Sequence, residues 1–163
     1  MATKHQQLSH YVLDDIPSAS NMKFGIVVAE WNSDITENLF NGALNTLIKC
    51  GCRKDHIFRK NVPGSFELSL GAQLFLNSTD VDAVICLGSV IKGETKHFDF
   101  VCQTTANGIK DVSLKYNKAV IFGVLTDNTH EQAKDRSGGK LGNKGIEAAI
   151  SAIKMVHLKN NMT

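Results

Sequence analysis

The sequence predicts a single α/β domain in which a parallel β-sheet is covered by helices on both faces. Two observations carry this prediction. Short runs of mostly apolar residues, of the length typical of buried strands, recur along the chain. Between them lie segments whose apolar residues recur at helical spacing. Such an alternation requires right-handed crossovers, which place helices on both faces of a parallel sheet.

Residues 1–22 differ in composition from the rest of the chain. They are polar, contain Pro17 and show no sustained period, so we expect an extended N-terminal arm. The remaining residues, 23–163, are then one domain, because a chain of 163 residues has the usual size of a single folding unit.

The first strand and the first helix follow this arm. Residues 23–29 are rich in β-branched side chains and predict the strand. Asp34 and Glu37 have the spacing of a capping box, which predicts a helix that begins there. Its apolar residues recur at helical spacing to about Cys50, and Gly51 is expected to end it.

The second strand, the second helix and the third strand are expected next. Residues 56–62 form a shorter and partly polar strand. A helix is expected over residues 65–75, with Glu67 in the first turn, where a carboxylate suits the helix dipole. Residues 84–87 are apolar throughout and predict a strand buried on both faces, ended by Gly88.

The second half of the chain continues the alternation. A third helix is predicted by one apolar face, formed by Phe98, Val101, Cys102, Thr105, Ile109 and Val112. Residues 119–125 predict the fourth strand. Thr129 and Gln132 form a second capping box, for a short helix that ends near Ser137. After the tight link 138–143, a last helix carries one apolar stripe, formed by Ile146, Ala149, Ile150, Ile153 and Val156.

The resulting order, β-α-β-α-β-α-β-α-α, is typical of a flavodoxin-like three-layer sandwich. It has a four-stranded parallel sheet, helices on both faces and, in this chain, the extended N-terminal arm. Folds of this kind bind ligands outside the carboxyl ends of the strands. Candidate functional residues are therefore sought in the loops that follow the strands.

Composition disfavours several classes of function. The formal net charge is +2 and the basic residues form no tract, which argues against nucleic-acid binding. The sequence shows no leader-like start and no apolar run long enough to cross a bilayer, so we expect a cytoplasmic protein without a membrane partner. The four cysteines lack metal-site spacing, and we interpret them as buried reduced thiols, with a Cys50–Cys52 metal or redox pair as the less favoured alternative.

The loop after the third strand has the features of an anion site. Gly93, Glu94 and Thr95 are expected at the start of the third helix, where free backbone N–H groups and the helix dipole favour a phosphate. A plain strand-to-helix turn explains the same residues equally well. Lys92 and Lys96 flank this loop and are either part of the site or solvated.

His97 falls in the first turn of the same helix, where a neutral imidazole can accept a proton. A lone histidine in a helix is more often a surface or capping residue, and only its position after the loop favours the catalytic interpretation. Asp99 is either its hydrogen-bond partner or a carboxylate that balances the helix dipole.

Aromatic and charged residues follow other strands. Trp31 comes directly after the first strand and either stacks on a heterocyclic ligand or packs at the edge of the core. Phe66 and Glu67 begin the second helix at the same sheet edge, and Glu67 can accept hydrogen bonds from ligand hydroxyls. Arg136 and Lys144 flank a glycine-rich segment that suits phosphate, although cations at helix ends often only balance the dipole.

Four blocks of sequence, taken together, carry a resemblance to a known family. They are AEWN at 29–32, VPGSFEL at 62–68, LGSVIKGETKHFDFV at 87–101 and FGVLTDNTHEQAKDRSGGKLGNKG at 122–145. In this order they resemble the 6,7-dimethyl-8-ribityllumazine synthase family over about residues 24–155. The resemblance implies a transferase that condenses 5-amino-6-(D-ribitylamino)uracil with 3,4-dihydroxy-2-butanone 4-phosphate. The products are the lumazine, phosphate and water, in the penultimate step of riboflavin biosynthesis, and no cofactor or metal is implied.

The resemblance also implies roles for particular residues. His97 is the expected catalytic residue, which handles protons. Trp31 is expected to stack on the pyrimidine, and Phe66 and Glu67 to hold the ribityl chain. The expected phosphate-binding residues are Gly93, Glu94, Thr95 and Arg136. The full set of expected substrate-binding residues is Trp31, Asn32, Ser65, Phe66, Glu67, Val90, Ile91, Lys92, Phe122 and Lys144.

Members of this family assemble as pentamers, pairs of pentamers or icosahedral shells. The resemblance implies active sites between subunits, with Phe122, Arg136 and Lys144 supplied by the neighbour of the chain that supplies Trp31 and His97. The short link before the last helix favours the shell, and the arm is expected to add to a neighbour's sheet edge. Whether riboflavin synthase is a partner stays open.

Another class of function fits the same fold. A non-catalytic flavin- or lumazine-binding module, or a shell-forming storage protein, would keep Trp31 but need neither His97 nor Arg136. Formation of product from the two substrates discriminates between these alternatives and the enzyme.

Overall fold

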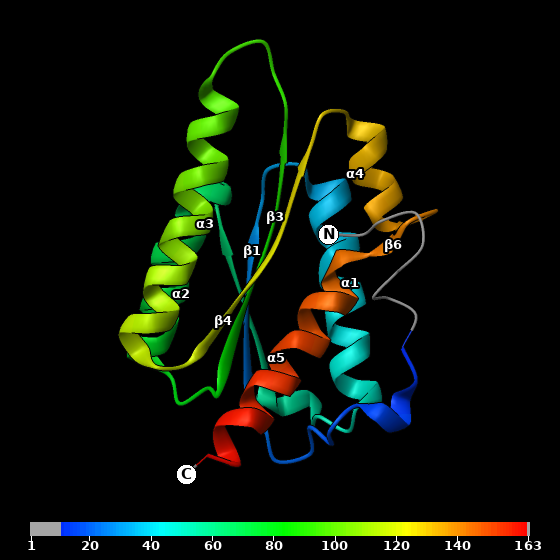
Figure 1. Ribbon diagram of the computed structural model, residues 1–163, viewed down its shortest axis with the longest axis vertical. Coiled ribbons are helices and arrows are strands. Elements are labelled where there is room, and N and C mark those ends of the chain that lie inside the picture. The colour runs from blue at the N-terminus through cyan, green and yellow to red at the C-terminus, as the bar shows by residue number, and fades with distance from the viewer. Residues whose placement is uncertain (1–10, 163) are drawn as a thin grey trace.

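The computed structural model describes residues 11–162. Its centre is a four-stranded parallel sheet with the strand order β2-β1-β3-β4 (Figure 1). The strands are β1 (Phe24–Ala29), β2 (Ile57–Val62), β3 (Ala83–Ile91) and β4 (Ala119–Asp127). This topology confirms the predicted flavodoxin-like α/β architecture.

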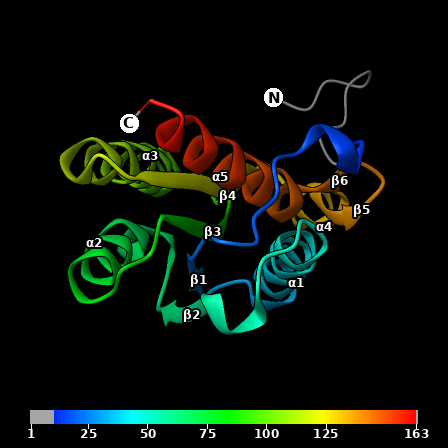
Figure 2. The same cartoon turned by 90° about the horizontal axis from the view of Figure 1, so that it is seen from below.

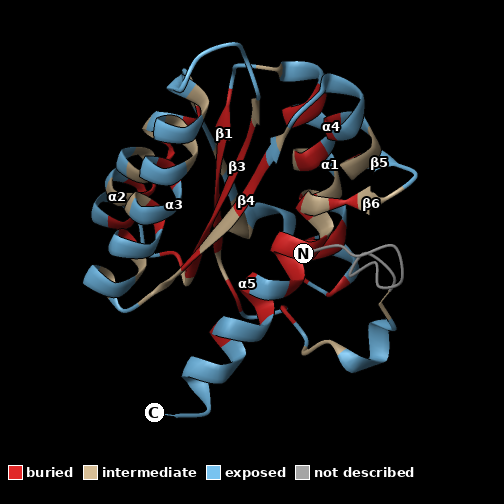
Figure 3. Cartoon of the chain, turned by 45° about the horizontal axis from the view of Figure 1, so that its top comes forward, coloured by how far each residue is buried: buried red, intermediate tan, exposed pale blue. Residues whose placement is uncertain are grey.

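Helices form a layer on each face of the sheet. On one face lie α2 (Leu68–Ser78) and α3 (His97–Tyr116), and on the other lie α1 (Ser33–Lys49), α4 (His130–Arg136) and α5 (Lys144–Asn160) (Figures 1 and 2). The inner sides of the helices are buried and their outer sides are exposed (Figure 3). The three-layer arrangement predicted from the alternation of elements is therefore confirmed.

Alternation of side chains along the strands divides the core into two parts. In β1, Ile26 packs with the α1, α4 and α5 layer, whereas the next residue, Val27, packs with the α2 and α3 layer. Ile85 and Cys86 of β3 divide in the same way, and both are fully buried. The apolar run of β3 thus reflects burial on both faces, as expected for a central parallel strand.

The predicted end of the third strand at Gly88 is wrong. The strand continues to Ile91 because Ser89, Val90 and Ile91 pair with the last three residues of β4. Gly88 serves packing instead, since a Cβ at this position would lie 2.6 Å from the Ser65 Oγ. The longer strand carries three more residues into the region where a ligand is expected.

Two predicted helix starts differ from the structure. The capping box of Asp34 and Glu37 does not form: α1 begins at Ser33 and its N-cap, Asn32, makes no side-chain capping bond. Glu37 pairs with Arg59 of β2 instead. The helix predicted over residues 65–75 is a 3-10 turn, η3 (Ser65–Glu67), followed by α2, which continues to Ser78.

The capping box before α4 is confirmed, because the Gln132 N–H donates to the Thr129 Oγ1 at 3.2 Å. After α4, the predicted link contains two short strands, β5 (Ser137–Gly139) and β6 (Gly142–Asn143), which pair antiparallel. This small hairpin connects α4 to α5.

The predicted N-terminal arm is only partly described, because residues 1–10 lie outside the described residues. The described part of the arm contains a short 3-10 helix, η1 (Leu13–Asp15). Another 3-10 helix, η2 (Lys54–His56), lies outside the arm, directly before β2. Ala19 and Met22 are buried in the core, and the Ala19 N–H donates to the Cys50 carbonyl at 2.8 Å. The end of the arm therefore packs on its own domain.

Candidate functional site

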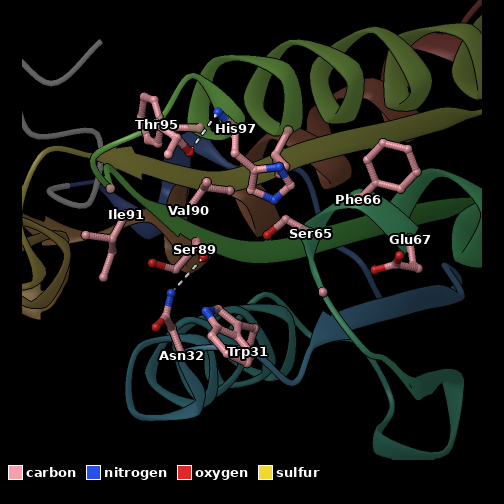
Figure 4. A pocket seen from close by; sticks show the side chains of 14 residues that line it. Trp31, Asn32, Ser65, Phe66, Glu67, Ser89, Val90, Ile91, Thr95 and His97 are labelled. Carbon is pink, nitrogen blue, oxygen red and sulfur yellow. Dashed lines mark hydrogen bonds between the residues drawn. The ribbon is translucent and has the colours of Figure 1, made fainter.

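A pocket of about 630 Å³ lies at the carboxyl ends of β1 and β3, where ligands bind in sheets of this kind. It extends between the loop after β1, the η3 turn and the start of α3. Trp31 and Asn32 form one side of it, and Thr95 and His97 lie across from them (Figure 4). Ten of the residues expected at the site line this pocket: Trp31, Asn32, Ser65, Phe66, Glu67, Val90, Ile91, Gly93, Thr95 and His97.

The loop after β1 presents an aromatic ring to the pocket. Trp31 is 73 % exposed, so the alternative that it packs at the edge of the core is wrong. Its backbone N–H donates to the Pro63 carbonyl at 3.2 Å, which ties the loop to the segment before η3. Asn32 adopts a left-handed backbone conformation, which asparagine tolerates, and its Nδ2 donates to the Ser89 carbonyl at 3.0 Å. The loop that carries the tryptophan is thus held by a backbone hydrogen bond at Trp31 and by a side-chain hydrogen bond at Asn32.

The η3 turn forms a second wall. Ser65 is buried, whereas Phe66 is 54 % exposed and has room to contact a ligand. Glu67, the last residue of the turn, also lines the pocket and carries the one carboxylate among the lining residues. The turn is attached to α3 by the Thr105 Oγ1, which donates to the Ser65 carbonyl at 3.1 Å.

Ser89 is a lining residue that sequence reasoning missed. It is 2 % exposed, and its Oγ is buried without a hydrogen-bond partner inside the described part of the chain. The omission follows from the strand prediction that ended at Gly88. The signal was available, because the apolar residues Val90 and Ile91 after Gly88 indicate that the strand continues. A strand that continues to Ile91 places Ser89 at the same end of the sheet as these two residues.

The loop between β3 and α3 differs from the expectation. α3 begins at His97 with Lys96 as its N-cap, so Gly93, Glu94 and Thr95 precede the helix and do not form its first turn. Both ends of this connection lie later in the sequence than predicted, because β3 ends at Ile91 and α3 begins at His97. Open space lies where a Cβ of Gly93 would be, and Thr95 lines the pocket beside it.

Two predicted residues of this loop, Lys92 and Glu94, are exposed but do not line the pocket. The Lys92 N–H donates to the Asp127 carbonyl at 2.9 Å, which fixes the start of the loop against β4. The structure therefore brings the backbone of this loop, with Gly93 and Thr95, to the pocket, whereas the lysine and glutamate side chains extend elsewhere.

His97 is exposed and lines the pocket at the first position of α3. Its backbone N–H donates to the Thr95 Oγ1 at 3.4 Å. Within residues 11–162, no hydrogen bond joins the imidazole to Asp99, whose backbone N–H donates to the Lys96 carbonyl at 3.0 Å. Asp99 therefore fits the interpretation of a carboxylate in the first turn that balances the helix dipole.

Besides Lys92 and Glu94, three more expected residues do not line the pocket: Phe122, Arg136 and Lys144. They belong to β4 and to the two helices that follow it and pack against it, α4 and α5. Phe122 is half-buried and packs with the α2 and α3 layer. The chain therefore holds the expected residues in two groups.

Buried polar atoms lie in and beside the second group. Arg136 is the last residue of α4, and its Nε is buried without a hydrogen-bond partner among residues 11–162. The Oδ2 of Asp127, at the end of β4, is buried without a partner in the same range. Burial raises the pKa of the Asp127 carboxyl, and the nearby positive charge of Arg136 opposes this increase. Buried polar atoms normally have a hydrogen-bond partner in the protein or in an ordered water.

Lys144 is fixed at the start of α5. Its Nζ lies 2.8 Å from the Glu147 Oε2, and Glu147 is 6 % exposed. Asn143 caps the helix, because its Oδ1 accepts from the Gly145 N–H at 2.8 Å while its Nδ2 donates to the carbonyls of Asn38 and Ser137. The lysine is thus held by a paired carboxylate and by a well-bonded helix start.

Residues 11–162 offer no arrangement for metal binding or for crossing a membrane by a helix. No group of three or more His, Cys, Asp and Glu side chains is placed to hold a metal ion in this range. The helices of the same range include none with the length and apolar character needed to span a membrane. The cysteines Cys50, Cys52, Cys86 and Cys102 are all free thiols, and burial raises the pKa of each.

Comparison with known proteins gives a consistent result. The family model of 6,7-dimethyl-8-ribityllumazine synthase matches residues 21–160. The 6,7-dimethyl-8-ribityllumazine synthase of Cytophaga hutchinsonii is 58 % identical over 156 residues, which cover 96 % of this chain and 98 % of the relative. The proteins of the same name from Flavobacterium johnsoniae and Parabacteroides distasonis are 55 % and 52 % identical, over 98 % and 96 % of this chain and 84 % and 98 % of their own lengths. The chain belongs to the 6,7-dimethyl-8-ribityllumazine synthase family.

Proposed function

We propose that this protein condenses 5-amino-6-(D-ribitylamino)uracil with 3,4-dihydroxy-2-butanone 4-phosphate, as a transferase in the penultimate step of riboflavin biosynthesis. One observation supports this most strongly. A single pocket brings together an exposed tryptophan ring, a carboxylate and a histidine, in a chain whose relatives bear the name of this enzyme. The proposal needs no cofactor or metal.

The ribitylaminouracil would bind along the first group of residues. The indole of Trp31 offers an exposed face on which the pyrimidine can stack. Phe66 and Glu67 would hold the ribityl chain, because the Glu67 carboxylate can accept hydrogen bonds from its hydroxyls. Asn32 and Ser65 complete this part of the pocket.

The phosphate of the second substrate would lie at the loop after β3. Gly93 leaves room for a ligand to approach the backbone closely, and Thr95 offers a hydroxyl beside it. A guanidinium group recognises phosphate with two parallel hydrogen bonds, which is the role we assign to Arg136. Because Arg136 does not line this pocket, it would have to come from another copy of the chain.

The chemistry requires proton transfers and close alignment. The 5-amino nitrogen attacks the ketone and forms an imine with loss of a first water. Phosphate then leaves by elimination, and the ribityl-bearing nitrogen attacks the remaining carbonyl and closes the ring with loss of a second water. His97 lies at the pocket wall where it can accept and return protons. Alignment of two substrates in one pocket can itself lower the barrier by about 7–11 kcal/mol. Lys144 would lie near the reacting centre.

The assembly follows from the position of the second group. We propose a homo-oligomer built of pentamers, as an icosahedral shell, in which Phe122, Arg136 and Lys144 of one copy complete the pocket of the next. The short hairpin between α4 and α5 supports the shell over a lone pentamer. Free thiols at all four cysteines support a cytoplasmic location, where thiols stay reduced.

The decisive experiment is to mix both substrates with the purified protein and to follow the absorbance of the lumazine and the release of phosphate. We expect both products from the wild-type protein. Replacement of His97 by Ala should lower kcat by about 10²–10⁴-fold, the usual contribution of general acid–base catalysis.

A matched control is available in His157, which is also exposed and helical but lies in α5 outside the pocket. His157→Ala should leave kcat unchanged. Binding of the lumazine without any turnover by the wild-type protein would contradict the proposal and favour a non-catalytic binding module. An unchanged kcat in the His97 variant would remove His97 from the mechanism.

A further inference from the structure

Thr105 connects the two walls of the pocket without lining it. Its side chain is completely buried inside the α2 and α3 layer, two turns into α3. The Thr105 Oγ1 donates to the Ser65 carbonyl at 3.1 Å, across 40 residues of sequence. Ser65 is buried in the η3 turn, which presents Phe66 and Glu67 to the pocket.

This hydrogen bond has an unusual direction for a threonine in a helix. A buried helical threonine often donates to the carbonyl four residues earlier, as Thr46 does in α1, where its Oγ1 lies 2.8 Å from the Gly42 oxygen. Thr105 reaches a different element instead. Its hydroxyl is therefore a tie between α3 and η3, whereas the hydroxyl of Thr46 stays within one helix.

The η3 turn depends on few other side chains. Neither Gly64, its N-cap, nor Glu67, the N-cap of α2, makes a side-chain capping bond. The Ser65 carbonyl also accepts from the Leu68 N–H, but that bond lies within the turn itself and does not place it against the rest of the protein. Among the described residues, the Thr105 hydroxyl is the one side chain that hydrogen-bonds to residues 63–67.

The same helix begins with His97, eight residues before Thr105. At a rise of about 1.5 Å per residue, the two positions are about 12 Å apart along one rigid rod. We propose that Thr105 is a positioning residue, through which α3 holds the ribitylaminouracil-binding turn at a fixed place relative to His97. This inference rests on the proposed function, because it takes η3 as the wall that binds the pyrimidine substrate.

The test compares Thr105→Val, which keeps the shape and removes the hydroxyl, with Thr105→Ser, which restores it. We expect the valine variant to raise KM for the ribitylaminouracil about tenfold, since a hydrogen bond of about 1.4 kcal/mol corresponds to that ratio. KM for the butanone phosphate, which would bind at Gly93 and Thr95, should stay within about twofold. The serine variant should return both constants to wild-type values.

Thr46→Val is the matched control, because it also removes a buried hydroxyl from a helix but lies outside the pocket. It should lose stability without any change in either KM. If Thr105→Val and Thr46→Val have the same KM for the ribitylaminouracil, or if the serine variant fails to restore it, the positioning role is wrong. If the valine variant does not fold, Thr105→Ala is tested in its place with the same criteria.

Binding is measured separately from turnover by quenching of the fluorescence of Trp31, which is the single tryptophan of the chain. Titration with ribitylaminouracil should give an approximately tenfold weaker Kd for Thr105→Val than for wild type. If the wild-type protein binds this compound but forms no product, the proposed function is wrong. The positioning role of Thr105 would still be supported by a weaker Kd in Thr105→Val. If wild type and Thr105→Val have equal Kd values and the wild-type protein forms product, only the positioning role of Thr105 is wrong.

Discussion

The two groups of expected site residues are built in different ways. The first lies in loops after the strands, where Trp31 and Phe66 expose their rings to an open pocket. The second lies on β4, α4 and α5, where Lys144 is paired with a buried carboxylate and the buried Nε of Arg136 has no partner in the part of the chain that the structure describes. The first group has room for a ligand, whereas the second contains one buried guanidinium nitrogen whose hydrogen bond is not made within the described residues.

This difference indicates where complementarity is missing. A buried guanidinium nitrogen without a hydrogen-bond partner is costly, and such atoms are rare in complete native structures. The pocket of the first group, in turn, has no lysine or arginine among its lining residues within the range 11–162, and so lacks a cation for the phosphate that we propose as part of the substrate. Each group therefore has what the other lacks, although one chain does not bring them together.

The largest expected effect comes from separating the two groups on different chains. His97→Ala and Arg136→Ala should each reduce activity about 100-fold or more when present alone. When the two variants are co-expressed in equal amounts, random assembly would place intact copies of both groups in about one quarter of the sites. The measurement is the specific activity of the mixed oligomer relative to the wild-type protein.

The control for this experiment is a chain that carries both substitutions, co-expressed with wild-type chain. Sites formed between copies would again be intact in about one quarter of cases, whereas sites formed within one chain would be intact in about one half. No recovery of activity in the mixture of single variants would show that one chain must supply both groups, and it would break the comparison made above.

An intermediate effect is expected when the exposed ring of the first group is removed. Trp31→Ala should raise KM for the ribitylaminouracil about tenfold, because stacking of a heterocycle on an aromatic side chain contributes about 1–3 kcal/mol. Trp31→Phe keeps a stacking face and should stay within about threefold of wild type. Initial rates at varied substrate concentrations give both values.

The stability of the Trp31→Ala protein sharpens the same point. The side chain is largely exposed, so its removal should leave the thermal unfolding temperature nearly unchanged. A large drop in that temperature would mean that Trp31 belongs to the packed structure rather than to a ligand site.

The smallest effect is expected at Asp127, beside Arg136. Burial raises the pKa of its carboxyl in the folded protein, so the folded state binds the proton more tightly than the unfolded state. The free energy of unfolding should therefore decrease as pH rises from about 4, the ordinary value of the group, through its raised pKa. Asp127→Asn removes the ionisable group and with it this decrease in the free energy of unfolding. The variant should therefore be slightly more stable than wild type at pH 7, by less than about 1 kcal/mol because solvent screens the group.

Denaturant unfolding of both proteins at pH 7 and near pH 4 provides the measurement. The difference between them should disappear at the lower pH, where the aspartate is protonated in both states. A lower stability of the asparagine variant at pH 7 would show that Asp127 and Arg136 stabilise each other within the chain. The second group would then be complete without another copy.

Prediction from sequence worked best where a local pattern and the fold agree. The apolar run of β3 and the capping box of Thr129 and Gln132 both appear as expected, because each depends on residues close in sequence. The capping box of Asp34 and Glu37 has an equally good pattern and does not form. Arg59, 22 residues away, pairs with Glu37 instead, and no local pattern reports that competition.

The sequence by itself determined the class of fold, the order of elements and the family, because apolar periodicity and contiguous motifs are properties of neighbouring residues. Tertiary structure alone decided how far β3 extends and which residues meet at the pocket. Ser89 contacts Asn32 across 57 residues, and Thr105 contacts Ser65 across 40. The physical reason is that strand pairing and packing of distant segments fix these contacts, so they exist only once β1, η3 and α3 are assembled on β3.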